Sequence, residues 1–285
     1  MNICFIVDNY PSEGFPAANT FVETLVNAMV DNGEKCYVIA PQSLSNAIKQ
    51  HREILPYKRT RKTSTGKKIT VLTPKYLSLS VKKFGKINMA ELTLIFFRYA
   101  AEKAYKRIMK HVNFDAFYGH FIFESGITAN YLGHKYGIPA FFAYGENTTY
   151  TIDYLGDEKT KTLLNGVTGV ISVSSENKRI LLEHGLVDAR KIDVFPNSVD
   201  TTMFYPSERK RVRKKLGFPE DGFIIAFMGR LLHVKGPDRL ANAIQQIDDE
   251  KIYSIFLGTG PLKPNCKNVL FCNTVQHFQV SEYLS

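Results

Sequence analysis

The chain has 285 residues, of which 44% are hydrophobic, and its net charge is +10. This length and composition predict two domains with sizeable cores and exclude a disordered chain. No apolar run reaches the ~18–20 residues that a membrane-spanning helix needs. Residues 1–7 lack the features of a signal peptide. The charge is local, because residues 51–110 contain 16 Lys and Arg against 3 acidic residues.

The chain begins with the pattern of a βαβ unit. Residues 2–7 form a short apolar run that ends at Asp8 and predicts a buried strand. Apolar residues then recur at helical spacing from about Asn19 to Gly33, and residues 35–40 form a second apolar run. A strand, a helix and a strand in this order predict a parallel sheet with helices on its faces.

The same alternation continues and predicts a doubly wound α/β domain over residues 1–200. Its long helix spans residues 89–111, and the apolar side chains expected to face the core are Leu92, Ile95, Phe96, Tyr99 and Ile108. The further expected strands are 69–72, 115–118, 140–143, 167–173 and 192–195, and the further expected helices are 127–136 and 176–184.

A second, smaller α/β pattern occupies residues 201–285. Residues 196–215 are rich in proline and basic side chains and are expected to form a linker. Three strands are about half of an ordinary α/β domain, so we expect this domain to be incomplete, with an open sheet edge. The predicted elements are strands at 223–228, 252–257 and 269–271, a helix at 237–247 and a last helix from about Phe278.

The strongest local signal for a ligand is the loop after strand 223–228. Gly229 ends that strand, and Arg230 and Lys235 follow on a loop that leads into helix 237–247. Ligands of open α/β sheets bind at this edge, and two cations beside free helix N–H groups suit a diphosphate. The alternative is that both cations are ordinary solvated loop residues.

Other loops at carboxyl ends of strands carry weaker signals. Gly258 and Gly260 either let the backbone approach a ligand or form a tight turn, and from the residues alone the turn is favoured. His120 follows strand 115–118, where it can hydrogen-bond a hydroxyl, polarise a reacting group or be a structural loop residue. Gly145 and Glu146 follow strand 140–143 and would line the same cleft.

Other chemistries lack their motifs. The first strand is not followed by Gly-x-Gly-x-x-Gly, and the chain has no Walker loop, His-Glu-x-x-His or Gly-x-Ser-x-Gly. These absences argue against an ordinary dehydrogenase, nucleotide hydrolase, zinc protease or serine hydrolase. The cysteines, at positions 4, 36, 266 and 272, are widely spaced with no histidine at ligand spacing. They exclude a zinc ribbon and dense disulfides, and they indicate a reducing compartment.

Taken in order, these segments resemble the retaining family-4 glycosyltransferases with the GT-B fold, in which two Rossmann-like domains face each other. The run from Gly229 through Gly236 resembles the family's donor-phosphate motif, and residues 258–261 and 269–275 resemble its later donor loops. The resemblance implies that Arg230 and Lys235 bind the donor diphosphate and that Gly229, Gly258, Gly260 and Val275 belong to the donor loops.

The first domain carries the acceptor side of the resemblance. Residues 114–121 resemble the segment that places an active-site histidine, here His120, toward the acceptor and the transferred sugar. The resemblance also implies that Asn19, Gly145 and Glu146 line the acceptor cleft.

The chain departs from the family pattern at three places. Ala18 and Asn19 replace a glycine pair in the first loop, and Tyr144 stands where many members have histidine. The family's C-terminal pair of glutamates, eight residues apart, has no counterpart, because Glu282 is the only acid after Glu250. Those glutamates would hold the donor's ribose and sugar hydroxyls, so the resemblance implies a C-terminally truncated donor domain.

The resemblance implies an enzyme that moves a sugar from a nucleotide diphosphate to an acceptor hydroxyl with retention, in polysaccharide or glycolipid assembly. Its expected partners are the nucleotide-sugar donor and a saccharide or lipid-linked saccharide acceptor, with no metal or other cofactor. The alternative is a catalytically incomplete fragment or pseudoenzyme that binds a sugar nucleotide or a partner. A nucleic-acid partner is not expected, because residues 51–110 lack a recognisable nucleic-acid-binding motif.

The basic segment is interpreted as a surface that attaches loosely to anionic membrane, at the cytoplasmic face of the cell membrane. Mixing of cations with apolar side chains suits a bilayer interface, and the alternative is a solvated charged face. A dimer that covers the open edge of the second domain is a further expected association. The residues on which the membrane interpretation rests are Tyr57, Lys58, Arg59, Arg61, Lys62, Leu79, Lys82, Lys83, Phe84 and Lys86.

Overall fold

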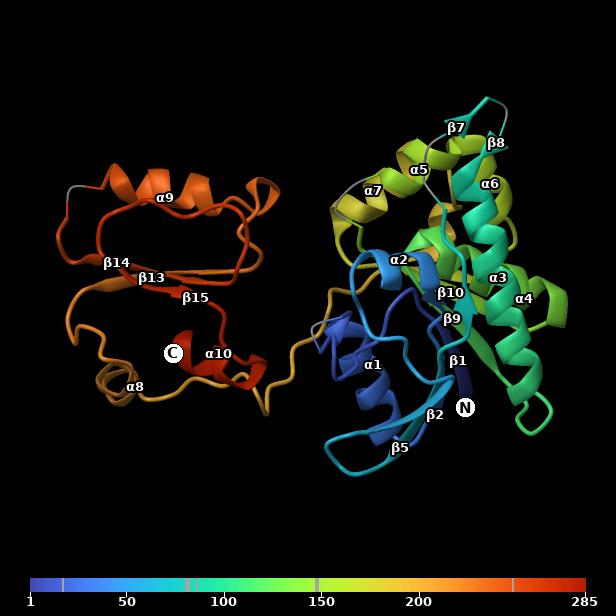
Figure 1. Ribbon diagram of the computed structural model, residues 1–285, viewed down its shortest axis with the longest axis horizontal. Coiled ribbons are helices and arrows are strands. Elements are labelled where there is room, and N and C mark those ends of the chain that lie inside the picture. The colour runs from blue at the N-terminus through green and yellow to red at the C-terminus, as the bar shows by residue number, and fades with distance from the viewer. Residues whose placement is uncertain (17, 80–82, 86, 147–148, 248) are drawn as a thin grey trace. The chain divides into compact units, whose positions relative to one another are not determined.

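The chain forms two compact units, Met1–Ser198 and Val199–Ser285, which divide next to the boundary expected between residues 200 and 201 (Figure 1). Among the described residues, no helix is long and apolar enough to cross a membrane. The residues that the computed structural model describes are 1–16, 18–79, 83–85, 87–146, 149–247 and 249–285.

The first unit contains an eight-stranded sheet that is parallel except for its edge strand β4. β1 lies between β2 and β9, so the strand order reverses there as in doubly wound folds. The predicted doubly wound α/β fold is thereby confirmed for this unit. In spatial order the strands are β12 (Ile192–Val194), β11 (Gly169–Ser172), β10 (Ala140–Tyr144), β9 (Ala116–His120), β1 (Asn2–Ile6), β2 (Lys35–Ile39), β5 (Lys68–Leu72) and β4 (Lys58–Lys62).

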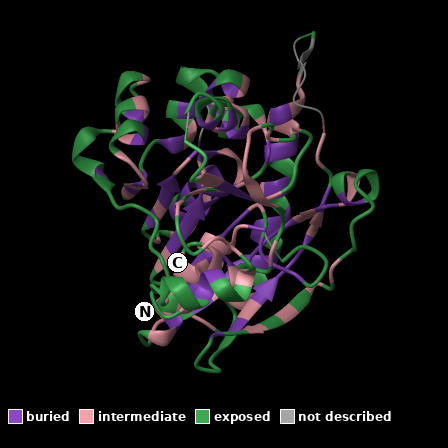
Figure 2. Ribbon diagram, turned by 90° about the vertical axis from the view of Figure 1, so that its left-hand side faces the viewer, coloured by how far each residue is buried: buried purple, intermediate pink, exposed green. Residues whose placement is uncertain are grey.

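Helices cover both faces of this sheet, and the strands between them are buried (Figure 2). α1 (Thr20–Asp31) packs its valines against one face, and α3 (Met89–Ile108) and α4 (Ile127–Tyr136) pack against the other. The remaining helices of the unit are α2 (Leu44–Lys49), α5 (Tyr150–Leu155), α6 (Asp157–Leu164), α7 (Ser175–Glu183) and the 3-10 helix η2 (Ala189–Lys191).

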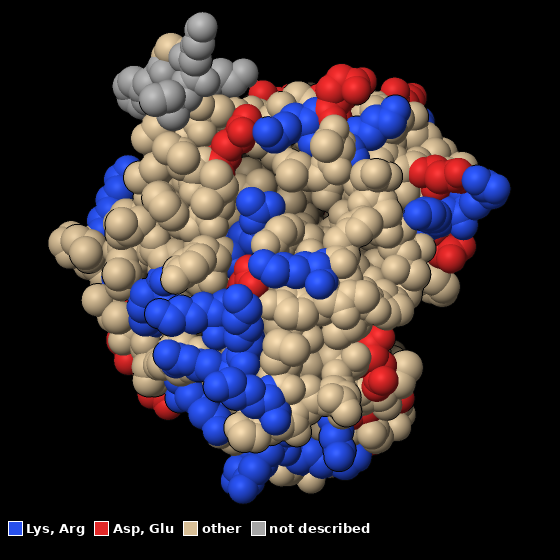
Figure 3. All heavy atoms as spheres, turned by 90° about the vertical axis from the view of Figure 1, so that its right-hand side faces the viewer, with Lys and Arg blue, Asp and Glu red and all other residues tan. Residues whose placement is uncertain are grey.

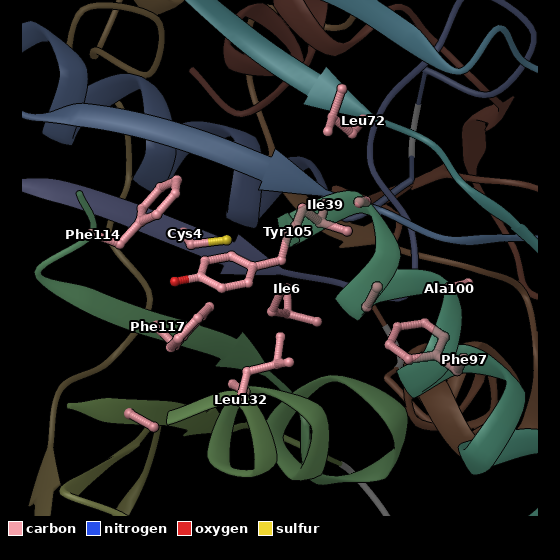
Figure 4. Close-up of a cluster of buried hydrophobic side chains, with 14 of the residues drawn as sticks. Cys4, Ile6, Ile39, Leu72, Phe97, Ala100, Tyr105, Phe114, Phe117 and Leu132 are labelled. Carbon is pink, nitrogen blue, oxygen red and sulfur yellow. The ribbon is translucent and has the colours of Figure 1, made fainter. Parts of the chain in front are cut away.

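The core under α3 is built around Tyr105 (Figure 4). Its ring is 1% exposed, and its centroid lies 4.9 Å from that of Phe117 and 5.5 Å from that of Phe114. Cys4 of β1 and Leu132 of α4 belong to the same cluster, together with the other side chains labelled there. Burying a large side chain contributes roughly 1.5–3 kcal/mol, so this cluster fixes both helices on the sheet.

The face of α3 that packs on the sheet is not the predicted one. Ile95, Phe96 and Tyr99 are exposed, Tyr99 at 68%, while Leu92 and Ile108 are half-buried. Small residues let the helix lie close to the bulky strand side chains, whereas the predicted stripe would hold it away. The side chains that α3 buries are Ala90, Thr93, Leu94, Phe97, Ala100, Ala101, Glu102, Ala104 and Tyr105.

The basic edge strand β4 was not predicted, because it contains no apolar residue. Its side chains alternate: Lys58, Thr60 and Lys62 are exposed, whereas Arg59 and Arg61 are half-buried. Charged side chains on an edge strand discourage pairing with another chain. The unit also has two short ladders, which join β3 (Gln42–Ser43) to β6 (Lys75–Tyr76) and β7 (Lys83–Phe84) to β8 (Ile87–Asn88).

The second unit contains a three-stranded parallel sheet in the order β13 (Phe223–Met228), β14 (Ile252–Leu257) and β15 (Val269–Asn273). α9 (Pro237–Gln245) packs against one face of β14, and α10 (Val280–Tyr283) packs against the other. These strands and helices confirm the elements expected after residue 222. The unit also contains two 3-10 helices, η3 (His233–Lys235) and η4 (His277–Gln279).

Part of the expected linker is a helix. α8 (Arg209–Leu216) buries Val212 and Arg213, so the last residues of the expected linker are helical and packed. The guanidinium of Arg213 explains the fold of this segment, because its Nη1 donates to three carbonyl oxygens at 2.9–3.2 Å. The acceptors are those of Pro219, Glu220 and Gly222. The remaining cations of the run lie on the solvated side of the helix.

The three-stranded sheet is expected to be the least stable part of the chain, because β13 and β15 are edge strands and Phe223 and Met228 are 65% and 56% exposed. We expect amide hydrogens of β13–β15 to exchange faster than those of β1 and β11, measured by hydrogen–deuterium exchange mass spectrometry. Slow exchange is expected only if a dimer covers these edges, which light scattering would detect. A monomer whose β13–β15 exchange as slowly as β1 would contradict the prediction.

Candidate functional site

Polar side chains gather at the carboxyl ends of three neighbouring strands of the first unit. Asp8 follows β1, His120 ends β9 and Glu146 follows β10. Because these strands are adjacent and parallel, the three residues lie at one edge of the sheet. β9 extends beyond the expected strand, so His120 is its last residue and does not belong to the following loop.

His120 is buried among aromatic rings, with 3% of its surface exposed. The centroids of Phe21 and Phe121 lie 4.9 Å and 4.7 Å from that of the imidazole, and the Tyr118 hydroxyl lies 3.3 Å from Nδ1. Burial lowers the pKa of His120 to about 4, so the ring is neutral at neutral pH. With Tyr118 as donor to Nδ1, the imidazole proton is on Nε2, where it can be donated to a ligand.

A strained turn follows His120 and leads into α4. Phe121 and Glu124 have φ values of 70° and 59°, and residues Ile122–Gly126 form a kinked turn, η1, in which Phe123 and Glu124 are not helical. A Cβ on Gly119 would lie 2.6 Å from the Cα of Gly126, so only glycine fits there. Non-glycine residues in the left-handed region cost about 1–3 kcal/mol each and concentrate at functional sites.

Glu146 supports this turn. Its carboxylate is buried; Oε1 accepts the backbone N–H of Ile122 at 2.8 Å, and Oε2 accepts the Thr151 hydroxyl at 3.4 Å. Burial raises the pKa of Glu146 to about 7, although the backbone hydrogen bonds oppose that rise. The preceding Gly145 is required by packing, because a Cβ there would lie 2.9 Å from Cγ2 of Val173.

Besides Glu146, the edge carries the carboxyl groups of Asp8 and Glu124. Oδ1 of Asp8 accepts from Nδ2 of Asn19 at 2.8 Å, and Oε2 of Glu124 accepts from the Tyr76 hydroxyl at 3.2 Å. Burial raises the pKa of both acids; that of Glu124 reaches about 8, with the charge of Asp8 as the second cause. Within the described residues neither carboxyl is ion-paired, so both are available to hydrogen-bond hydroxyl groups of a polar ligand.

Asn19 adopts a left-handed backbone conformation, which favours glycine. Its φ and ψ are 46° and 44°, in the left-handed region that asparagine tolerates better than other side chains. Its amide also donates to the carbonyl oxygen of Asn9 at 3.2 Å. The side chain of Asn19 therefore holds Asp8 and ties the loop before α1 to the carboxyl end of β1.

In the second unit, Arg230 and Lys235 lie on the loop between β13 and α9. Both side chains are exposed, and within the described part of the chain neither makes a hydrogen bond or ion pair. Gly229 and Gly236, with φ of 147° and 79°, lie before and after these cations, and Gly236 is the N-cap of α9. Two uncompensated cations beside a helix N-terminus produce a positive potential that suits phosphate groups.

Gly258 and Gly260 bring a second loop against this one. A Cβ on Gly258 would lie 1.8 Å from the carbonyl oxygen of Gly229, and one on Gly260 would lie 2.3 Å from that of Leu231. The N–H of Leu231 donates to the carbonyl oxygen of Thr259 at 3.0 Å. The glycines therefore allow backbone-to-backbone packing of the two loops, whatever they contribute to a ligand.

The predicted site residues thus fall into two groups, one in each unit. Val275 belongs to neither group, although it lies in the second unit. Its half-buried side chain packs with Ile255 and Val280 in the small core of that unit. Among the described residues, no group of three or more His, Cys, Asp or Glu is placed to hold a metal ion.

Sequence reasoning missed Asp8, Glu124 and Tyr76. Asp8 had a usable signal, since it stands directly after the first apolar run, as His120 stands after a later one. Glu124 had none, because its position depends on the strained turn, and Tyr76 comes from a two-residue strand.

The sequence profile of Glycosyltransferase Family 4 matches residues 18–203, and the chain belongs to this family. It is 24% identical over 291 residues to a Bacillus subtilis glycosyltransferase named for teichuronic acid biosynthesis, TuaC, covering 100% of this chain and 72% of that protein. It is 34% identical over 83 residues to a D-inositol 3-phosphate glycosyltransferase of Mycobacterium leprae, which covers 29% of this chain and 19% of that protein.

Solved structures share the fold. Anabaena HepE in complex with UDP-glucose has a TM-score of 0.58 and 14% identity, covering 100% of this chain and 71% of HepE. A glycosyltransferase from Rickettsia africae has a TM-score of 0.60 and 15% identity, covering 99% of this chain and 70% of that chain. The expected GT-B-like α/β fold is confirmed.

The raised pKa of Glu124 predicts a pH-dependent stability. Its pKa is about 8 in the folded chain against 4.5 for an ordinary glutamate, so between pH 5 and 8 the folded state keeps a proton that the unfolded state has lost. Stability attributable to this group therefore falls as pH rises through that window. Glu124→Gln, which stays neutral and can still accept from Tyr76, should raise the melting temperature relative to wild type by several degrees more at pH 8.5 than at pH 5.

Differential scanning calorimetry at both pH values measures this effect, with the exposed Glu13→Gln as the matched control. Parallel pH profiles for Glu124→Gln and wild type would show that Glu124 is ionised throughout.

Proposed function

We propose that the chain is a retaining glycosyltransferase that moves a sugar from a nucleotide diphosphate to an acceptor hydroxyl. The observation that carries this proposal is the pair of uncompensated cations, Arg230 and Lys235, on a glycine-bordered loop beside the N-terminus of α9. Membership of glycosyltransferase family 4 supports it, as does the fold shared with a protein whose structure contains UDP-glucose.

On the donor side, Arg230 and Lys235 bind the diphosphate and stabilise the negative charge that develops on it as the sugar leaves. Gly229, Gly258 and Gly260 keep the two donor loops free of side chains, so that the backbone lies close to the nucleotide. The two cations supply the charge that a metal ion would otherwise provide, so we expect turnover to be unaffected by EDTA.

On the acceptor side, His120 donates a hydrogen bond from Nε2 to a hydroxyl at the reacting centre, and its buried, neutral ring suits this role. Glu146 holds the turn that follows His120, with Asn19 and Gly145 shaping the same edge. The acceptor belongs to polysaccharide or glycolipid assembly, a class that the name of TuaC supports.

A second candidate is a pseudoenzyme or fragment that binds a sugar nucleotide without transferring the sugar. Nucleotide binding without consumption of any nucleotide sugar would select this candidate.

The diphosphate assignment predicts weaker nucleotide binding when the cations are removed. Charge-assisted contacts contribute roughly 1.5–3 kcal/mol each, so Lys235→Ala should weaken binding of UDP, GDP or ADP by about 10- to 150-fold in isothermal titration calorimetry. Lys210→Ala, an exposed cation of α8, is the matched control and should bind as wild type does. Equal affinity of wild type and an Arg230→Ala, Lys235→Ala double variant would refute the assignment.

We also propose that the outer face of α3 attaches the chain to anionic membrane on the cytoplasmic side. Ile95, Phe96 and Tyr99 are exposed on this helix, and Lys and Arg gather beside uncharged side chains on the surface in Figure 3. Apolar side chains next to cations suit a bilayer interface. The exposed cations that follow along α3 and just beyond it are Lys103, Lys106, Arg107 and Lys110.

This surface differs from the one expected at residues 57–62. Arg59 and Arg61 turn inward, where Arg61 pairs with Glu23 at 2.7 Å, so Lys58 and Lys62 alone remain outward. Lys82 and Lys86, also part of that expectation, lie outside the described residues.

Co-sedimentation with phosphatidylglycerol vesicles tests the membrane proposal. Wild type should pellet at low salt and less at high salt, and Phe96→Ser with Tyr99→Ser should lower the apparent affinity by about 10-fold or more. Leu182→Ser, which removes an exposed apolar side chain from α7, should leave pelleting unchanged. Absence of wild-type pelleting at low salt, or equal pelleting of the double variant, would reject the proposal.

A further inference from the structure

The first unit contains a cavity of about 320 Å³ at the carboxyl ends of β1, β2 and β5. Ligand sites begin at about this volume, which accommodates one monosaccharide unit with a substituent. Asp8 and Glu124 form one end of the wall; Arg59 of β4 and Thr73, which directly follows β5, lie at the other end. The cavity therefore extends the edge that carries His120 toward the basic strand β4.

Three residues of this wall have buried polar atoms that make no hydrogen bond within the described part of the chain. They are Oη of Tyr10, Oγ1 of Thr73, and Nε and Nη2 of Arg59. Tyr10 is 4% exposed and Thr73 is 1% exposed, so neither is solvated in the ordinary way. Leaving a buried polar group unpaired costs about 1–3 kcal/mol, and three such groups around one cavity indicate a polar ligand.

Arg59 supplies the most specific of these groups. Its Nη1 donates to the carbonyl oxygen of Pro11 at 3.0 Å, whereas its buried Nε and Nη2 have no partner among the described residues. Arg61, two residues along the same strand, uses the corresponding edge to hold the carboxylate of Glu23, with N–O distances of 3.1 Å and 2.7 Å. Arg59 thus has free the same pair of donors that Arg61 uses on one carboxylate oxygen, Oε1 of Glu23.

The charges of the wall give the cavity a direction. Lys75 lies near Arg59 and holds the wall residues Gln42 and Leu55 through hydrogen bonds of 2.6 Å from its ammonium. Asp8 and Glu124 form the acidic end, beside β9, because β1 separates β9 from β2, β5 and β4. Arg59 therefore attracts an anionic group to the β4 end of the cavity, whose wall also contains Arg52 and Glu53, whereas the carboxyl groups of Asp8 and Glu124 suit hydroxyl groups.

We propose that this cavity binds an acidic sugar of the acceptor, with its carboxylate or phosphate on the Nε–Nη2 edge of Arg59 and its hydroxyls toward Asp8 and Glu124. Thr73 and Tyr10 hydrogen-bond the same sugar. This orientation directs a hydroxyl of the acceptor toward the β9 edge and His120. The role as acceptor rests on the proposed function, whereas the binding of an acidic sugar by the first unit does not.

Ligand-observed NMR titration tests the proposal with D-glucuronate, glucose 1-phosphate, glucose and inorganic phosphate. The protein is the full chain carrying Arg230→Ala and Lys235→Ala, so that anions have no access to the expected donor loop. We expect glucuronate, glucose 1-phosphate or both to bind at least 10-fold more tightly than glucose, and the stronger of the two identifies the acidic group. Equal affinity for inorganic phosphate and glucose 1-phosphate would overturn the sugar assignment.

Variants locate the binding. Arg59→Gln should weaken binding of the acidic sugar by about 10- to 150-fold, while Arg61→Gln, the same change of charge on the same strand, should bind as the parent does. Thr73→Val supplies a second variant that keeps the shape of the core. Because its hydroxyl has no partner in the chain, its removal should preserve or raise the melting temperature and yet weaken binding.

Unchanged binding in both Arg59→Gln and Thr73→Val, or no binding of either acidic sugar by the parent, would overturn the inference. Neither result bears on the donor site, because loss of that site is measured separately by nucleotide titration of Lys235→Ala. Acidic-sugar binding without any transfer of sugar would instead contradict the proposed function alone.

Discussion

The turn that joins β9 to α4 is the constraint on which the first unit's site depends. Gly119 lies against Gly126 too closely for any side chain, and Glu146 accepts the backbone N–H of Ile122. Together these contacts maintain the left-handed conformation of Glu124, and thereby place its carboxyl group against Tyr76 and the cavity. The same turn places the ring of Phe121 against the imidazole of His120. One turn therefore contributes both to the burial of His120 and to the positions of the carboxyl groups of Glu124 and Glu146.

Close packing at glycines also shapes the loops of the second unit, but these loops carry cations where the first unit carries carboxyl groups. Glycines let the loops after β13 and β14 pack backbone to backbone, and the loop thereby held presents Arg230 and Lys235 without acidic partners among the described residues. Sugar transfer needs both kinds of site, because a leaving diphosphate requires cations, whereas an attacking hydroxyl requires hydrogen-bond partners. In the proposed function, the first unit supplies the hydrogen-bond partners and the second unit supplies the cations.

Apolar periodicity predicted most strands and helices, because buried parallel strands are short apolar runs bounded by glycine, proline or polar residues. It failed for β4 and α8, which contain almost no apolar residues, and for the buried face of α3, where two apolar stripes compete and packing decides. The expectation that ligand-binding residues follow the carboxyl ends of parallel strands led to His120 and Arg230 as candidates, since such a strand end can be inferred from its sequence pattern. Arg59 and Glu124 escaped it, because one lies on an antiparallel strand and the other on a strained turn.

The most direct test of the account is the turnover of wild type and His120→Ala with a panel of UDP-, GDP- and ADP-sugars and an acceptor glycan, at saturating donor and acceptor. The account predicts that one donor is consumed with transfer of its sugar, and that His120→Ala lowers turnover by roughly 100-fold or more while nucleotide affinity stays unchanged. Unchanged turnover in His120→Ala would contradict the role of the first unit's edge, and bound nucleotide without any transfer would contradict the enzyme itself.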